Sequence, residues 1–65
     1  MLTFYRGHWI LTFSTDRRWT SEITERASAE ILPTCVSVDL SEGLQTCIET
    51  AKRLIDMYLQ CPTRR

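Results

Sequence analysis

The sequence has little of what marks the specialised protein classes. Its 65 residues contain two glycines and two prolines, and they carry no net charge. Collagen-like, low-complexity and disordered chains are excluded, because these need far more glycine or proline, or a strong excess of one charge. Long apolar runs are also absent, and none approaches the roughly 20 residues that cross a bilayer. The remaining class is one small globular domain over 1–65, in which 43% of the residues are hydrophobic.

Metal-binding and redox patterns are scarce as well. The three cysteines, Cys35, Cys47 and Cys61, form no CxxC pair, and His8 is the only histidine. An odd number of separated cysteines does not indicate a disulfide framework and lacks the ligand spacing of a zinc site. We therefore expect a protein of the reducing cytoplasm with no metal and no cofactor. Cys35 and Cys47 are expected to pack as small core residues, and Cys61 to be exposed.

Catalytic motifs are missing too. His8 is the one candidate imidazole base, but no serine or cysteine motif surrounds it. Glycine-rich phosphate loops and paired-carboxylate motifs are not present in the sequence. We expect His8 to be a solvent-facing strand residue and the chain not to be an enzyme.

The last third of the chain predicts an amphipathic helix over 41–60. Apolar residues recur there at spacings of four and three, which places them on one face of a helix. This face, expected to pack on a sheet and widened by Cys47 and Leu54, comprises Leu44, Ile48, Ala51, Ile55 and Tyr58. The start of the helix has two options, Ser41 as N-cap or Asp39 in a capping box with Glu42. Gly43 is expected to weaken the first turn, because glycine is a poor helix former.

The first half of the chain predicts β-strands. Residues 8–14 and 19–26 alternate in polarity and are rich in aromatic and β-branched residues, and the polar segment 15–18 is the expected hairpin loop. A further main strand is expected over 32–38, and the sequence leaves open a short additional strand over 2–5. This order predicts an α+β fold: a three-stranded antiparallel meander followed by one C-terminal amphipathic helix on one sheet face.

The first main strand is apolar on both faces. Trp9, Leu11 and Phe13 alternate with Ile10, so that one apolar set faces outward whichever set packs under the helix. A large exposed apolar patch marks an interface, and a domain of this size gains burial by association. We expect a homodimer, or binding to a protein partner, through the open sheet face or an edge strand. The expected interaction surface comprises Tyr5, Arg6, Trp9, Ile10, Arg17, Arg18 and Trp19.

Arginines and aromatic residues also interleave in the strand half. Arg6, Arg17, Arg18 and Arg26 lie near Tyr5, Trp9 and Trp19 in sequence. Such residues on a small sheet can hold phosphates and stack bases, although the balanced net charge argues against this use. The sequence therefore predicts a non-enzymatic protein–protein interaction module, with a regulatory role as one option. The alternative is a small nucleic-acid-binding protein, and no membrane partner is expected.

The chain as a whole resembles small stand-alone bacterial proteins of the cyanobacterial type, which have no assigned function. The residues that carry this resemblance are Tyr5-Arg6-Gly7, Trp19 and the segment 51–56, Ala-Lys-Arg-Leu-Ile-Asp. The resemblance implies a β-β-β-α fold and does not indicate what activity the chain has.

The second half of the chain resembles the HicB-like antitoxin domain. The matching segments are Leu32-Pro33-Thr34-Cys35, Ser41-Glu42 and Met57-Tyr58-Leu59. They cover less than half of the chain, and Thr34 stands where that family has a glycine. This resemblance implies the same order of elements and a protein partner.

Overall fold

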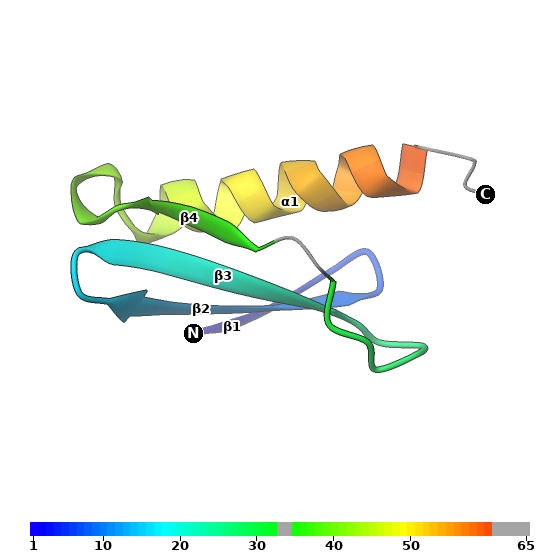
Figure 1. Ribbon diagram of the computed structural model, residues 1–65. Coiled ribbons are helices and arrows are strands. Elements are labelled where there is room, and N and C mark those ends of the chain that lie inside the picture. Colours follow the sequence, from blue (N-terminus) through cyan, green and yellow to red (C-terminus); the bar gives the residue numbers. More distant parts are fainter. Residues whose placement is uncertain (33–34, 61–65) are drawn as a thin grey trace.

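The structure, a computed structural model, describes residues 1–32 and 35–60, which form a four-stranded antiparallel sheet with one helix across one face (Figure 1). The strands follow the chain in the order β1-β2-β3-β4. Their bounds are Leu2–Tyr5, His8–Thr15, Arg18–Glu25 and Val36–Asp39, followed by the 3-10 helix η1, Leu40–Glu42, and the helix α1, Leu44–Gln60. The α+β class and the helix on one sheet face are confirmed, and the optional strand over 2–5 is present as β1.

Two tight turns set the register of the first three strands. Arg6 and Gly7 both have positive φ, +48° and +82°, which is the pattern of a type I′ hairpin turn, and Tyr5 pairs with His8 across it. The second turn contains only Asp16 and Arg17, because Thr15 and Arg18 already pair with each other. The expected loop over 15–18 is therefore shorter than predicted: β2 extends to Thr15, one residue further than expected, and β3 begins at Arg18 and ends at Glu25, each one residue earlier than expected.

The last strand is shorter than the sequence predicts. It begins at Val36, whereas residues before it pair with a different part of β3: Ile31 bridges Thr24, and the Leu32 N–H donates to Ile23 O at 2.8 Å. Between these two pairings, four residues separate Ile31 from Val36, whereas only two separate their partners Thr24 and Ser21 on β3. The ladder is interrupted for that reason. Cys35 is exposed here, so its expected place in the core is wrong.

The start of the helix follows the second of the two expected options. Glu42 accepts a hydrogen bond from the Asp39 N–H at 3.3 Å, but the turn that it caps is the 3-10 helix η1. Gly43 then has φ +91°, a conformation that side chains disfavour, and α1 begins at Leu44. Gly43 therefore forms the joint between two helices and does not weaken the first turn of α1. The expected exposure of Cys61, and the part of the expected last strand over 33–34, lie outside the described residues.

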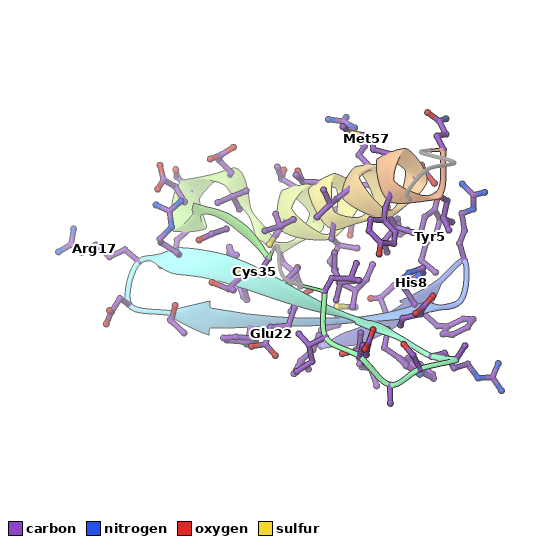
Figure 2. All side chains as sticks on the ribbon, turned by 45° about the vertical axis from the view of Figure 1, so that its right-hand side comes forward. Tyr5, His8, Arg17, Glu22, Cys35 and Met57 are labelled. Atoms are coloured by element: carbon purple, nitrogen blue, oxygen red, sulfur yellow. The ribbon has the colours of Figure 1, made fainter. Side chains whose placement is uncertain are left out.

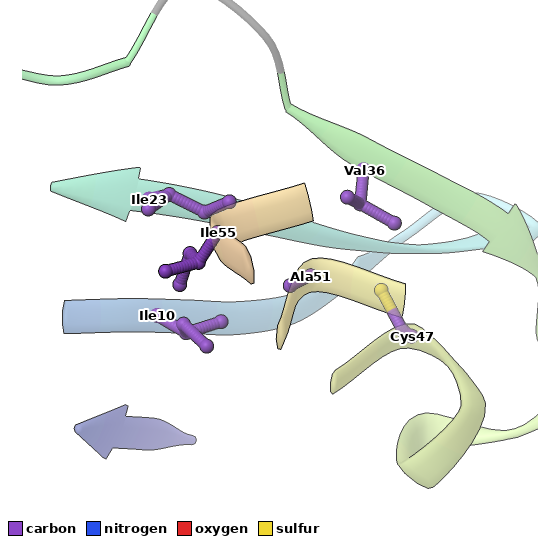
Figure 3. Packing of buried hydrophobic residues seen from close by; sticks show 6 residues of the cluster. All are labelled: Ile10, Ile23, Val36, Cys47, Ala51 and Ile55. Carbon is purple, nitrogen blue, oxygen red and sulfur yellow. The ribbon is translucent and has the colours of Figure 1, made fainter. Parts of the chain in front are cut away.

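The core lies between the sheet and α1. Buried residues from β2, β3, β4 and α1 form one cluster, shown in Figure 3: Ile10, Ile23, Val36, Cys47, Ala51 and Ile55. The predicted helix register is confirmed for Ile48, Ala51 and Ile55, and Leu44 is half-buried. The prediction that Tyr58 faces the sheet is wrong, since Tyr58 is 55% exposed. In Figure 1 the last turn of α1 extends past the β1–β2 turn, where no strand remains to cover it.

Candidate interaction surface

The helix covers the sheet face that is apolar across three neighbouring strands. Ile10 pairs with Ile23, and Ser21 with Val36, so these side chains share one face. Val38 and Trp19 lie on the same face and pack against the core. Ile10 is 0% exposed, and its expected place on the interaction surface is therefore wrong. The opposite face, which includes Trp9, Leu11 and Phe13, stays open.

The open face carries a continuous apolar area on β1 and β2, which we call the open-face patch: Leu2, Phe4, Trp9, Leu11 and Phe13. Four of these side chains are 39–59% exposed, and Phe13 is half-buried. The Phe4 and Trp9 rings pack with centroids 4.6 Å apart and planes tilted by 60°. The Arg26 guanidinium lies 5.9 Å from the Phe4 ring centroid, a cation–π distance. Exposed apolar groups that gather in this way mark an interaction site.

The other half of the open face is polar. Glu22 pairs with Leu11 and points away from the helix (Figure 2), with Thr20 and Thr24 on either side of it along β3. Arg18 donates from Nε to Ser37 Oγ at 2.6 Å and forms an ion pair with Asp39 at 3.2 Å. The open-face patch therefore ends at a polar border that runs along β3 and β4.

The remaining residues of the expected surface do not gather in one place. Arg17 lies at the exposed tip of the β2–β3 turn, and Trp19 lies half-buried on the helix-covered face. Trp9 and Arg18 share the open face but lie on its apolar and polar halves. Tyr5 and Arg6 belong to a separate cluster at the end of α1. Of the seven expected residues, only Trp9 belongs to the open-face patch.

The cluster at the end of α1 joins residues about 50 positions apart in sequence. The Tyr5 hydroxyl donates to Asp56 Oδ1 at 2.9 Å, and Arg6 Nη1 donates to the same oxygen at 2.7 Å. Lys52 Nζ lies 5.4 Å from the Tyr5 ring centroid. The hydrogen bonds from Arg6 and Tyr5 hold the pKa of the Asp56 carboxyl below its ordinary value, and the bond to Asp56 raises the pKa of Tyr5. The cluster fastens the β1–β2 turn to the helix.

The lowered pKa of Asp56 predicts a pH-dependent stabilisation. A carboxyl whose pKa is lowered by folding stabilises the fold above its unfolded pKa, about 3.9, and loses this effect as the pH falls through its folded pKa. Asp56→Asn should therefore unfold at lower urea concentration than the parent at pH 7, and the difference should shrink below about pH 4. Glu49→Gln is the control, since the two contacts of Glu49, with Lys52 Nζ at 3.8 Å and with Gln45 Nε2 at 3.0 Å, are exposed and lie within α1. If the difference between the urea midpoints of the parent and Asp56→Asn stayed the same from pH 2 to 7, the stabilising role of the cluster would be contradicted.

His8 is not solvent-facing as expected. It is 2% exposed, and its Nδ1 lies 3.0 Å from the Arg6 carbonyl oxygen, so Nδ1 carries the hydrogen. Nε2 has no hydrogen-bond partner among residues 1–32 and 35–60. The described part of the chain holds no pocket, and in it no three potential metal ligands gather.

A row of three hydrogen-bonded side chains is buried under α1, and it was not predicted from the sequence. Thr12 Oγ1 and Ser21 Oγ lie 2.8 Å apart on paired strands, and Ser21 Oγ lies 3.2 Å from Cys47 Sγ. All three residues are at most 1% exposed. The sequence did carry a sign of this hydrogen-bonded row: Thr12 lies on the same face of its strand as Ile10, and Ser21 on the same face as Ile23.

No family model, curated protein or solved structure matches this chain. Within the described residues, no helix is long and apolar enough to span a bilayer.

Proposed function

We propose that this protein is a non-enzymatic protein–protein interaction module of the cytoplasm, and that two copies bind each other through the open-face patch. One observation carries the proposal: five large apolar side chains lie together on the sheet face that α1 leaves uncovered. Sheets pack face to face about 10 Å apart, with their side chains interdigitated. A second copy offers the same surface and can cover the patch in this way.

Charge and surface area both favour a second copy of this chain as the partner that covers the open-face patch. The chain has no net charge, so two copies do not repel each other over distance. The charged groups around the open-face patch are balanced in sign: Glu22 and the Arg18–Asp39 pair lie on the polar border, and Arg26 lies over Phe4. A standard interface takes about 600 Å² or more from each partner. The chain exposes 4479 Å², and one sheet face can supply that area.

A charge in the open-face patch tests this proposal. Trp9→Glu places a carboxylate among apolar side chains in the interface, and should turn a dimer at low micromolar concentration into a monomer. Met57→Glu is the matched control, because Met57 is 64% exposed and lies on α1, on the other side of the sheet. Sedimentation velocity and the melting temperature at several concentrations measure the result, since a dimer melts higher as its concentration rises.

Two outcomes would overturn the proposal. One is a parent chain that stays monomeric at high micromolar concentration, with a melting temperature that does not depend on concentration. The other is a folded Trp9→Glu variant that associates as the parent does. Circular dichroism shows whether the variant is folded, and Leu11→Lys provides a second disruption if it is not.

The nucleic-acid alternative receives less support. Arg6 and Arg18 are bound to carboxylates of Asp56 and Asp39, and the arginines point to separate parts of the surface. Binding to single-stranded oligonucleotides with a steep salt dependence, detected by quenching of tryptophan fluorescence, would favour this alternative over self-association.

A further inference from the structure

The two edges of the sheet are not equivalent. In an antiparallel pair, residues alternate between those that bond to the neighbouring strand and those whose peptide groups point away from it. Met1 and Thr12 exchange both of their backbone hydrogen bonds, at 2.7 and 2.8 Å. The bonded pairs continue at Thr3 with Ile10 and at Tyr5 with His8. The N–H and C=O groups of Leu2 and Phe4 therefore point outward from the free edge of β1.

The opposite edge is partly closed by its own side chains. By the same alternation, which follows from the 3.0 Å bond between the Leu40 N–H and Arg17 O, Ser37 and Asp39 point outward on β4. Arg18 Nη2 donates to the Ser37 carbonyl at 3.3 Å, and Glu42 accepts from the Asp39 N–H at 3.3 Å. Asp39 also adds a charge to this edge. These are the devices by which edge strands avoid pairing, and within residues 1–32 and 35–60 none of them acts on Leu2 or Phe4.

We propose that two copies of this chain also join edge to edge, β1 against β1 in antiparallel register, with Thr3 of each copy on the two-fold axis. In this register Leu2 bonds with Phe4 of the partner subunit in both directions, and the symmetric pair doubles this to four hydrogen bonds. All outward peptide groups of Leu2 and Phe4 are then used. No other symmetric register uses every one of them.

The side chains fit the same register. Leu2 and Phe4 both lie on the open face, so Leu2 of one copy stands beside Phe4 of the partner subunit and covers apolar surface of the open-face patch. Thr3 meets its own copy in a non-hydrogen-bonded pair on the other face, where threonine pairs are favourable. The result is one continuous eight-stranded sheet.

This contact differs from the one under the proposed function and does not depend on it. It uses backbone groups at the edge, whereas the proposed face contact uses side chains of the open-face patch. It is also smaller, so we expect it to form at higher concentration than the face contact. A copy can make both contacts, and face-joined dimers should then associate into tetramers.

Amide hydrogen exchange reads the edge contact directly. The outward N–H groups of Leu2 and Phe4 exchange freely while the edge is exposed, and are protected when it is paired. We expect their exchange, followed by NMR, to slow by about tenfold or more between low micromolar and millimolar protein. The outward Ser37 N–H on β4 is the internal control, and its exchange rate should not change with protein concentration. A chain synthesised with N-methyl-Phe4, which lacks one outward donor and keeps every side chain, should lose the protection of Leu2.

The outcomes separate this inference from the proposed function. Association with no change in Leu2 and Phe4 exchange at millimolar protein overturns the edge contact, and so does a chain that remains monomeric there. Protection that persists in Trp9→Glu supports the edge contact by itself. Protection in N-methyl-Phe4 equal to that of the parent overturns the proposed register.

Discussion

Ile55→Ala is expected to destabilise the domain by about 2–5 kcal/mol, the range for removing a large side chain from a packed core. Ile55 is 0% exposed and belongs to the buried cluster with Ile10 and Ile23, shown in Figure 3. A chain of this length has a total stability of only about 3–10 kcal/mol. The variant should therefore be largely unfolded at 37 °C, or melt far below the parent.

Met57→Ala is the matched control for this prediction. Met57 lies two residues further along α1 and is 64% exposed, so its truncation leaves no cavity. Urea unfolding followed by circular dichroism should show a change of less than about 0.5 kcal/mol for this variant. If Ile55→Ala and Met57→Ala had equal urea midpoints, the helix would not present the face that the structure gives it.

Ser21→Ala is expected to cost about 1–3 kcal/mol, because it leaves a buried hydroxyl without its partner. Ser21 Oγ is the central group of the chain that links Thr12 Oγ1 to Cys47 Sγ. With Ser21 gone, the Thr12 hydroxyl loses a bond of 2.8 Å at a site that is 1% exposed. Thermal unfolding monitored by circular dichroism measures the loss.

A second substitution separates the lost hydrogen bond from lost packing. Thr12→Val replaces the orphaned hydroxyl by a methyl group of similar shape, so the double variant should be at least as stable as Ser21→Ala alone. Thr12→Val by itself should be destabilising, because it orphans Ser21 in turn. Strictly additive losses for the two variants would show that the two hydroxyl groups do not depend on each other.

The elements that follow local patterns could be predicted from the sequence. The apolar spacing of three and four along α1 placed Ile48, Ala51 and Ile55 on the buried face. The alternation of β2 and β3 located both strands to within about two residues. Tyr58 fitted the same periodicity and is nevertheless exposed, because periodicity describes a face of the helix and not the length of sheet beneath it.

The conformation of the turns was harder to predict than the strands. Arg6 and Asp16 both adopt positive φ, which no side-chain pattern announces. The β2–β3 turn has two residues where the sequence predicted four, whereas the two-residue turn at 6–7 is the one that the expected strands leave between them. The last strand, predicted from Leu32, begins at Val36 because its partners on β3 change along the way. The length of the β2–β3 turn and the start of the last strand both depend on how two segments pair with each other. The residue pattern within a single segment therefore does not predict them.

The sequence by itself determined the order of the strands and the helix, the buried face of α1, and the presence of apolar residues on both sides of β2. It left open which of those sides is buried. The tertiary structure decided this, because the register of the β2–β3 hairpin places Ile10 beside Ile23 and the apolar side of β3 and β4. A helix that crosses three strands gains most by covering the face that is apolar on all of them. The larger side chains of Trp9, Leu11 and Phe13 belong to a face that is polar on β3 and β4, and for that reason the helix does not cover them: Trp9 and Leu11 are exposed and Phe13 is half-buried.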